Sequence, residues 1–401
     1  MTGLRVGRAA YPLEVARGSS MAGYVARSGA VEGALHPLEV AAVAFVGSER
    51  TAVVCVADLL HVDDEVAYAV RAAVAEAVGT AADLVWLCAT HTHSGPEPRE
   101  VADQLGSHAV AAARDAIAGA VDAAVSLHRA ELAGVGGQRT GSARRATVPV
   151  DILGVADPSG SLVGVLGVLP VHPTVLGAGN TLVSPDLHGA VRRSLAADGI
   201  WSVVATGAAG DVSTRAHRRE QTPAEVDRLG ALAAAAMLSA VATPSIGVAS
   251  DVVGGWVESV GLPPGLVDAP FRRGALDAAQ RGLKEAESAG DAVRIREATV
   301  VLEGVELAAS YVPAGPVPCA TAYLDLGGIR LVGLGGEPFL DLAPGGTTVL
   351  VGYANGYAGY LPTRDAFAEA SADPDHPAYE VLISRVAPGS PERALAVALN
   401  G

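Results

Sequence analysis

The sequence predicts an α/β fold, because short apolar runs alternate with helical stretches along the chain. The runs are rich in Val, Ile or Leu and are bounded by Gly, Pro or charged residues, which is typical of buried strands. We expect strands at residues 51–56, 84–88, 162–169, 201–205, 329–334 and 347–351. Strands that alternate with helices favour largely buried sheets, with ligand sites gathered outside the strand ends.

Helical stretches fill the intervals between these runs. Residues 65–78 precede Gly79, a common helix stop, and residues 223–241 follow Thr222, an N-cap residue, with proline at the first helical position. Residues 108–127 repeat small and apolar side chains, and residues 275–289 form a charged helical stretch. Because no repeat or low-complexity linker interrupts the chain, we expect one compact catalytic domain over residues 1–401, with only a weakly marked boundary near residue 245.

Composition and charge exclude several classes of function. Of the 401 residues 50% are hydrophobic and 18% charged, a globular composition, and the formal net charge is −15 with Lys284 as the only lysine. Nucleic acids and anionic membranes attract basic surfaces, so we expect no nucleic-acid partner and no stable membrane association. The uncharged stretch 229–250 is Ala-rich and interrupted by Pro244, which predicts a buried helix followed by a turn.

The cysteines and the amino-terminal residues indicate the cellular compartment of the protein. Cys55, Cys88 and Cys319 are odd in number and widely spaced, which implies no disulfide framework. The first residues contain no apolar segment of the kind found in secretory signals. We therefore expect a cytoplasmic protein. The sequence leaves its oligomeric state open.

The segment Thr90-His91-Thr92-His93-Ser94-Gly95-Pro96 follows an apolar strand. On an extended backbone residues i and i+2 face the same way, so both imidazoles are expected to point into one site at the strand end. Two imidazoles on one side form half of a zinc site. Two separately hydrogen-bonded histidines are the structural alternative.

Polar groups follow four other apolar or glycine-rich segments. His172 stands between two prolines, Ser213 lies in Gly210-Asp211-Val212-Ser213, and Glu337 follows two glycines. Taken singly, each residue has a structural and a functional interpretation. His172 fits a structural histidine or a functional one, and Ser213 fits a turn or helix cap or a nucleophile. Glu337 fits a turn residue or a metal ligand or base. A tyrosine-rich segment contains Tyr360 and is followed by Tyr379. The shared layout indicates one site assembled from distant parts of the chain.

In this order the segments resemble the neutral (non-lysosomal) ceramidase family. The resemblance covers nearly the whole chain, from Val6-Gly7-Arg8-Ala9 through the His91 segment, His172-Pro173-Thr174 and Gly336-Glu337 to Tyr379-Glu380. It implies mixed β-sheets flanked by helices, an active site at strand ends, and zinc-dependent hydrolysis of an N-acyl amide. By motif, the zinc ligands implied are His91, His172, Glu337 and Tyr360.

The resemblance also implies roles around the metal. His93 and Tyr379 correspond to groups that contact the substrate carbonyl. Arg139 corresponds to an arginine expected in the family, and Arg144 and Arg145 are the alternatives. Ser213 corresponds to a serine once proposed as a nucleophile. We prefer activated water as the nucleophile, because it requires no covalent intermediate.

The residues that differ from the family pattern are expected near the substrate, and the expected zinc ligands are unchanged. Glu97 and Pro98 replace glycines, and Pro338-Phe339 follows Glu337. We also expect no carboxyl-terminal immunoglobulin-like domain. We therefore expect a small-molecule amide as substrate rather than membrane ceramide. The alternatives are a ceramidase proper, an esterase or lactonase with the same site, and a non-catalytic metal-binding protein.

Overall fold

Three large sheets form the framework of the described residues, which in this computed structural model are 3–141, 144–266, 269–310, 315–374 and 378–401. The first sheet has the order β5-β4-β3-β1-β6, with bounds Val85–Ala89, Thr51–Ala57, Leu38–Val46, Arg5–Leu13 and Val121–Asp122. The second has the order β12-β10-β9-β7-β14, with bounds Trp201–Thr206, Leu162–Leu169, Thr147–Ala156, Ala124–Ala133 and Gly247–Val248. The third has the order β15-β16-β17-β19, with bounds Gly254–Leu262, Val317–Asp325, Arg330–Leu334 and Thr348–Val351.

The three sheets enclose one central core. Val54 and Trp86 of the first sheet pack in the same cluster as Leu166 of the second and Leu331 of the third. Side chains alternate along each strand, so the opposite face of every sheet is apolar as well and needs a cover. Helices α1 (Asp64–Val78) and α2 (Ala102–Ala118) cover the first sheet, α3 (Asp186–Ala197) and α4 (Pro223–Val241) the second, and α9 (Ser390–Asn400) the third.

Both parallel and antiparallel pairs occur, which confirms the predicted mixed α/β class. β4 runs parallel to β5 and β10 parallel to β12, whereas β3 and β9 pair in antiparallel fashion with their neighbours. The six predicted strands match observed strands to within one residue at each end. The sequence pattern did not single out the long antiparallel strands β1, β3, β7, β9, β15 and β16.

One predicted helix is wrong in its second half. Helix α2 ends at Ala118 with Gly119 as its C-cap, and residue 127 lies in β7, which pairs with β9 over its whole length. Small apolar residues are compatible with both structures, and the cross-strand pairing prevails here. The stretch 229–250 is confirmed as a buried helix followed by a turn, because α4 ends at Val241. Within the described part of the chain, no helix combines the length and apolarity required for crossing a bilayer.

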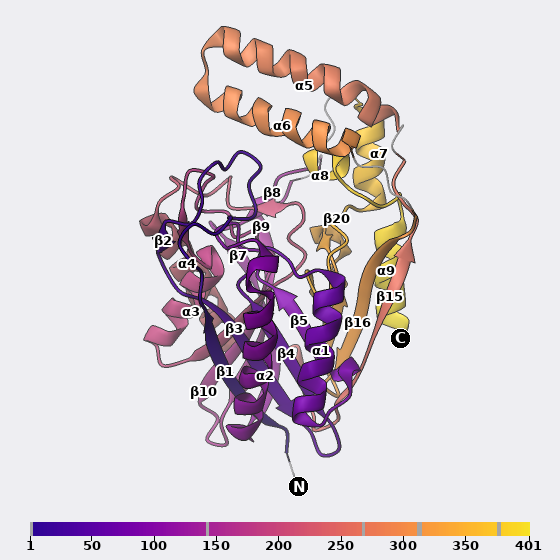
Figure 1. Ribbon diagram of the computed structural model, residues 1–401. Coiled ribbons are helices and arrows are strands. Elements are labelled where there is room, and N and C mark those ends of the chain that lie inside the picture. The colour runs from indigo at the N-terminus through magenta and orange to yellow at the C-terminus, as the bar shows by residue number, and fades with distance from the viewer. Residues whose placement is uncertain (1–2, 142–143, 267–268, 311–314, 375–377) are drawn as a thin grey trace.

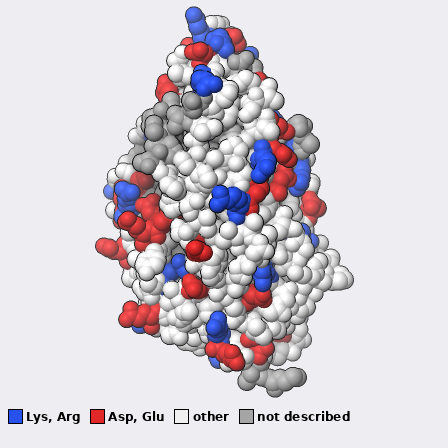
Figure 2. All heavy atoms as spheres, turned by 90° about the vertical axis from the view of Figure 1, so that its right-hand side faces the viewer, with Lys and Arg blue, Asp and Glu red and all other residues white. Residues whose placement is uncertain are grey.

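A helical hairpin departs from the layered arrangement. Helices α5 (Pro270–Ala289) and α6 (Ala292–Ser310) lie between β15 and β16 in sequence and project from one end of the molecule (Figure 1). Helices α7 (Arg364–Ala372) and α8 (Tyr379–Leu382) lie beneath this hairpin. Figure 2 shows acidic and basic side chains interspersed over the face that carries α9, without a continuous basic area.

A buried ion pair joins the first sheet to the cover of the second. Asp58, directly after β4, accepts hydrogen bonds at 2.6 and 3.1 Å from Arg192 of α3, and the two side chains are 1% and 12% exposed. The next residue, Arg193, pairs with Asp227 at the surface, where the side chains are 38% and 61% exposed. The two arginines therefore offer a matched comparison on one helix.

We predict that Arg192→Ala lowers the free energy of unfolding by about 3–5 kcal/mol, because it leaves the Asp58 carboxylate buried without its partner. Arg193→Ala should lower it by less than about 1 kcal/mol, since exposed ion pairs contribute little. Urea denaturation followed by circular dichroism measures both. Equal effects of the two substitutions would contradict this assignment.

Candidate metal centre

The candidate site lies where segments from all three sheets leave their strands. β5 ends at Ala89 and leads to His91, and β10 ends at Leu169 and leads to His172. β17 leads to Glu337, the first residue of the short strand β18 (Glu337–Pro338). β18 runs parallel to β20 (Tyr360–Leu361) and places Glu337 directly opposite Tyr360. Four residues far apart in sequence are thus fixed by the framework.

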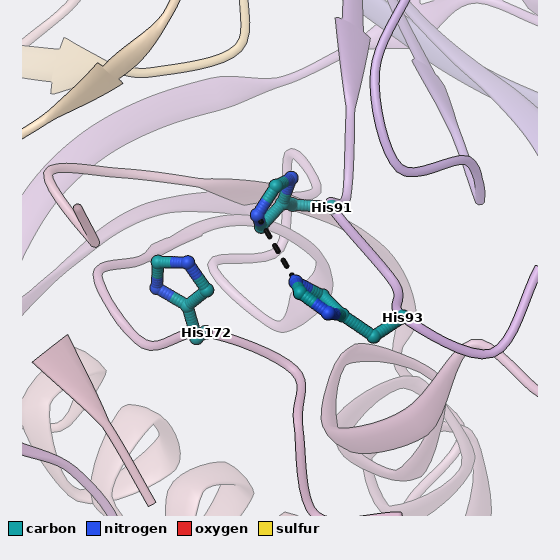
Figure 3. A group of neighbouring side chains, drawn as sticks. All are labelled: His91, His93 and His172. Atoms are coloured by element: carbon teal, nitrogen blue, oxygen red, sulfur yellow. Dashed lines mark hydrogen bonds between the residues drawn. The ribbon is translucent and has the colours of Figure 1, made fainter. Parts of the chain in front are cut away.

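Three imidazoles face one another in this site (Figure 3). The potential ligand atoms of His91, His93 and His172 all lie within 4.8 Å of one another, and the Nε2 atoms of His91 and His93 are 3.2 Å apart. Such a group is able to hold a metal ion. Figure 3 shows that the three rings enter from two chain segments and converge on a common space.

The carboxylate of Glu337 lies against two of these imidazoles. Its Oε2 atom is 3.1 Å from His172 Nε2 and 3.3 Å from His91 Nε2. Burial acts to raise the pKa of Glu337, but the neighbouring imidazoles of His91 and His172 outweigh it and hold the pKa well below its usual range. The three residues are 1–2% exposed, so this polar contact is shielded from water.

Backbone carbonyls orient the two buried imidazoles. Nδ1 of His91 lies 2.7 Å from the Leu60 carbonyl, and Nδ1 of His172 lies 2.6 Å from the Ala209 carbonyl. A carbonyl only accepts, so each Nδ1 carries a proton, and in the neutral form that binds a metal each ring would turn the lone pair of Nε2 inward. Burial lowers the pKa of His172 to about 4, with Arg139 acting in the same direction, which favours this neutral form.

The resulting donor set fits a divalent metal ion. Inward-facing lone pairs of His91 and His172 meet the oxygens of an ionised Glu337, and acceptor atoms in such contact require a cation between them. Carbonyl groups that fix the tautomer of ligating histidines are a recurrent feature of metal sites. His91, His172 and Glu337 therefore occupy positions from which they could hold a metal.

The expected extended backbone through the histidine pair is wrong. His91 has φ +63°, in the left-handed region that residues other than glycine seldom adopt. Tyr353 and Asn355, on the segment that faces His91, have φ +54° and +62°. The His91 and Tyr353 rings stack at 4.3 Å between centroids. Unfavourable backbone conformations of this kind concentrate where function requires a particular side-chain direction.

The predicted phenols lie beside the histidines. The Tyr360 ring stacks on the His172 ring with centroids 6.3 Å apart, and Tyr379 of α8 meets Tyr360 edge-on at 6.4 Å. Arg139 hydrogen-bonds Tyr360, pairs with Glu380 at 3.0 Å and donates to the Gly210 carbonyl at 2.6 Å. The structure thus brings Tyr360, Tyr379 and Arg139 together at one edge of the metal centre.

The rival arginines lie elsewhere. Arg145 pairs with Asp341 where both side chains are half exposed, and Arg144 is exposed. Ser213 is buried and forms a backbone bridge with His172, but its Oγ atom accepts a hydrogen bond from the Arg215 backbone at 3.4 Å. Among the described residues, no imidazole hydrogen-bonds to Ser213. The arrangement therefore lacks the base that a serine nucleophile requires.

Sequence reasoning did not assign Tyr353, Tyr357 or His61 to the site. The Tyr357 hydroxyl hydrogen-bonds Glu337 Oε1, and the Tyr353 hydroxyl donates to Glu337 Oε2 at 3.3 Å. His61 stacks on Tyr357 with centroids 4.5 Å apart. Tyr357 belongs to the tyrosine-rich segment that the sequence marked. Tyr353 and His61 carry no comparable signal.

Comparison with known proteins relates this geometry to a fold. No protein-family model and no curated protein matches the sequence. Among solved structures, neutral ceramidase from Pseudomonas aeruginosa superposes with a TM-score of 0.75 at 18% identity, over 99% of this chain and 73% of that chain. A ceramidase complexed with C2 superposes with a TM-score of 0.76 at 17% identity, over 99% and 74% of the two chains. The chain has the neutral-ceramidase fold.

Within this ceramidase-like fold, the hydroxyl of Tyr357 is well placed to control metal affinity. We predict that Tyr357→Phe weakens binding of a divalent metal about 10- to 100-fold, because Glu337 loses the hydrogen bond that orients its carboxylate. Competition with a chromophoric chelator measures the affinity. Tyr11→Phe removes an exposed phenol–Asp115 contact and should leave metal affinity unchanged.

Proposed function

We propose that this protein is a zinc-dependent hydrolase that cleaves an N-acyl amide bond of a small metabolite. The observation that carries the proposal is the buried contact of Glu337 with His91 and His172, flanked by Tyr360 and Arg139. The fold shared with neutral ceramidases supports an amide as the bond attacked.

Zinc fits this donor set better than magnesium or calcium does. Imidazole nitrogen suits zinc, whereas the hard cations prefer oxygen ligands throughout. Two histidines and a glutamate are a recurrent ligand set of catalytic zinc sites, which keep a further position open. We assign His91, His172, Glu337 and the phenol of Tyr360 as ligands. When bound, zinc acts as a Lewis acid and makes a water molecule nucleophilic near neutral pH.

We assign His93 a role in substrate binding and not as a metal ligand. It is partly exposed, whereas His91 and His172 are buried and held by the Leu60 and Ala209 carbonyls. No carbonyl fixes its Nδ1 among the described residues. We therefore place His93 against the substrate carbonyl, where it orients the scissile bond.

The opposite edge of the centre stabilises negative charge. Burial raises the pKa of Tyr379 to about 12, so this phenol keeps its proton and is able to donate a hydrogen bond. Arg139 holds a buried positive charge next to Tyr360. Donors aimed at the oxygen that becomes negative during acyl transfer typically contribute about 3–4 kcal/mol each to lowering the barrier.

The proposed substrate is a small molecule rather than a membrane lipid. His91, His172 and Glu337 are 1–2% exposed, and the chain carries a net charge of −15, which disfavours anionic bilayers. Ester or lactone cleavage at the same site is the nearest alternative, because esters are attacked more easily than amides. Hydrolysis of matched amide and ester pairs distinguishes the two reactions.

We predict that His91→Ala and His172→Ala each abolish zinc binding and lower kcat/KM by at least about 1,000-fold, since each removes a ligand. Ser213→Ala should retain zinc and keep kcat/KM within about tenfold. Chelation of the wild-type protein should remove activity, and added zinc should restore it.

His108→Ala, on the outer helix α2, is the matched control for loss of an imidazole. Zinc content is measured by plasma mass spectrometry, and turnover by release of the amine from N-acyl substrates. Full activity of a metal-free His172→Ala protein would exclude the zinc mechanism. Loss of activity in Ser213→Ala with zinc retained would instead make Ser213 the nucleophile.

A further inference from the structure

Cationic side chains gather on the His93 side of the metal centre. The loop between β1 and β3, drawn in indigo in Figure 1, arches over the same end of the molecule and carries Tyr24 and Arg27. The Tyr24 ring contacts the His93 ring with centroids 4.9 Å apart. The guanidinium carbon of Arg27 lies 4.9 Å from the centre of the same Tyr24 ring. Arg27 is therefore separated from His93 by a single aromatic ring.

No carboxylate of a described residue forms an ion pair with Arg27. Its Nη1 donates to the Ala22 carbonyl at 2.8 Å and its Nε to the Ala178 carbonyl at 3.4 Å. Its Nη2 is buried and has no hydrogen-bond partner among the described residues. A buried guanidinium nitrogen without an acceptor is destabilising, and such groups in native proteins call for an explanation.

Two further arginines approach from the segment that pairs with His172. Ser213 bridges His172 through the backbone, and Arg215 follows two residues later with an exposed side chain that makes no ion pair with a described residue. Arg218 donates to the Thr174 carbonyl, two residues after His172. Burial raises the pKa of Tyr24, whereas Arg218, Arg27 and Arg215 each act to lower it, which agrees with their closeness to that ring.

The acidic group nearest to this cluster is already engaged. Asp186 also influences Tyr24, but its carboxylate accepts backbone N–H groups of Val175, Leu176 and Leu187 at 2.7–3.1 Å. Its charge is thus shared between these backbone donors and Arg218. In a chain with a net charge of −15, Arg27 and Arg215 beside one aromatic ring form a local positive region.

We propose that the substrate carries a carboxylate on the side of its amide nearest His93, and that Arg27 and Arg215 recognise it. Guanidinium groups bind carboxylates through paired, charge-assisted hydrogen bonds, and such an anion supplies the acceptor that Arg27 Nη2 lacks. This inference rests on the proposed function, because it names the substrate class of the same site.

The geometry constrains the position of the anion within the substrate. The Arg27 guanidinium carbon and the His93 ring centre each lie 4.9 Å from the centre of the Tyr24 ring, so they are no more than twice that distance apart. An N-acyl amino acid whose carboxylate lies within a few bonds of the amide nitrogen is long enough to contact both groups at once. The substrate class is therefore an N-acyl amino acid.

The test compares two isosteric substrates, N-octanoyl-4-aminobutyrate and N-octanoyl-4-aminobutyramide, which differ in the charge of the terminal group. Amine release gives kcat/KM for each on the zinc-loaded full chain. The wild-type ratio of acid to amide should be at least about tenfold, because a hydrogen bond to a charged group contributes that factor or more. Arg27→Gln and Arg215→Gln should each move the ratio toward one.

Control variants and outcomes separate this inference from the proposed function. Arg114→Gln, an exposed arginine of α2, should keep the wild-type ratio. Arg215 is exposed, so its substitution tests recognition even where Arg27→Gln impairs folding. Equal cleavage of both substrates, or a high ratio that survives Arg215→Gln, would overturn the carboxylate inference alone. Cleavage of neither substrate would overturn the proposed function as well.

Discussion

The meeting of hydrogen-bond acceptors inside a nearly water-free site constrains the rest of this structure. Imidazole lone pairs of His91 and His172 face an ionised Glu337 at 3.1–3.3 Å, and their other ring nitrogens are committed to backbone carbonyls. Without a cation this arrangement is unfavourable by several kcal/mol, because buried polar groups lose hydration. A metal ion changes the sign of that contribution, so folding of the site and metal binding are coupled.

The framework holds the acceptors in this arrangement against their repulsion. Each metal-centre segment is anchored by backbone pairing to a neighbour: β18 to β20, Ser213 to His172, and Cys88 to Ala354. Two backbone hydrogen bonds also join the segment after β19 to β5. The Tyr353 carbonyl accepts from the Ala89 N–H, and the Asn355 N–H donates to the Leu87 carbonyl. These ties keep His91 and Tyr353 in left-handed conformations that an isolated loop would leave. A rigid framework thus maintains strain that positions the ligands.

Local sequence patterns revealed strands and single motifs, but not how the motifs meet. The runs at 84–88 and 329–334 were placed to within a residue because buried parallel strands are apolar throughout. The helix predicted through residue 127 failed because alternating small residues in β7 depend on pairing with β9, which is a long-range contact. The left-handed backbone of His91 has no signature in residue type. The Tyr353 hydroxyl reaches Glu337 only through tertiary packing.

Site residues were predictable where an ordered set of motifs resembled a known family. His91, His172, Glu337 and Tyr360 lie together, although no spacing rule connects them. Charge recognition beyond the metal depends on side chains from separate loops. The sequence does not indicate that Arg27 and Arg215 lie near the same Tyr24 ring, and only the folded structure brings them there.

The most direct test of the account is a crystal structure of the protein with anomalous scattering recorded on both sides of the zinc absorption edge. The account predicts one strong peak about 2.0–2.2 Å from His91 Nε2, His172 Nε2 and a Glu337 oxygen, with Tyr360 as the fourth ligand and His93 unbound. A peak coordinated by all three histidines would contradict the ligand assignment. A zinc-supplemented crystal without a peak between these residues would contradict the metal centre itself.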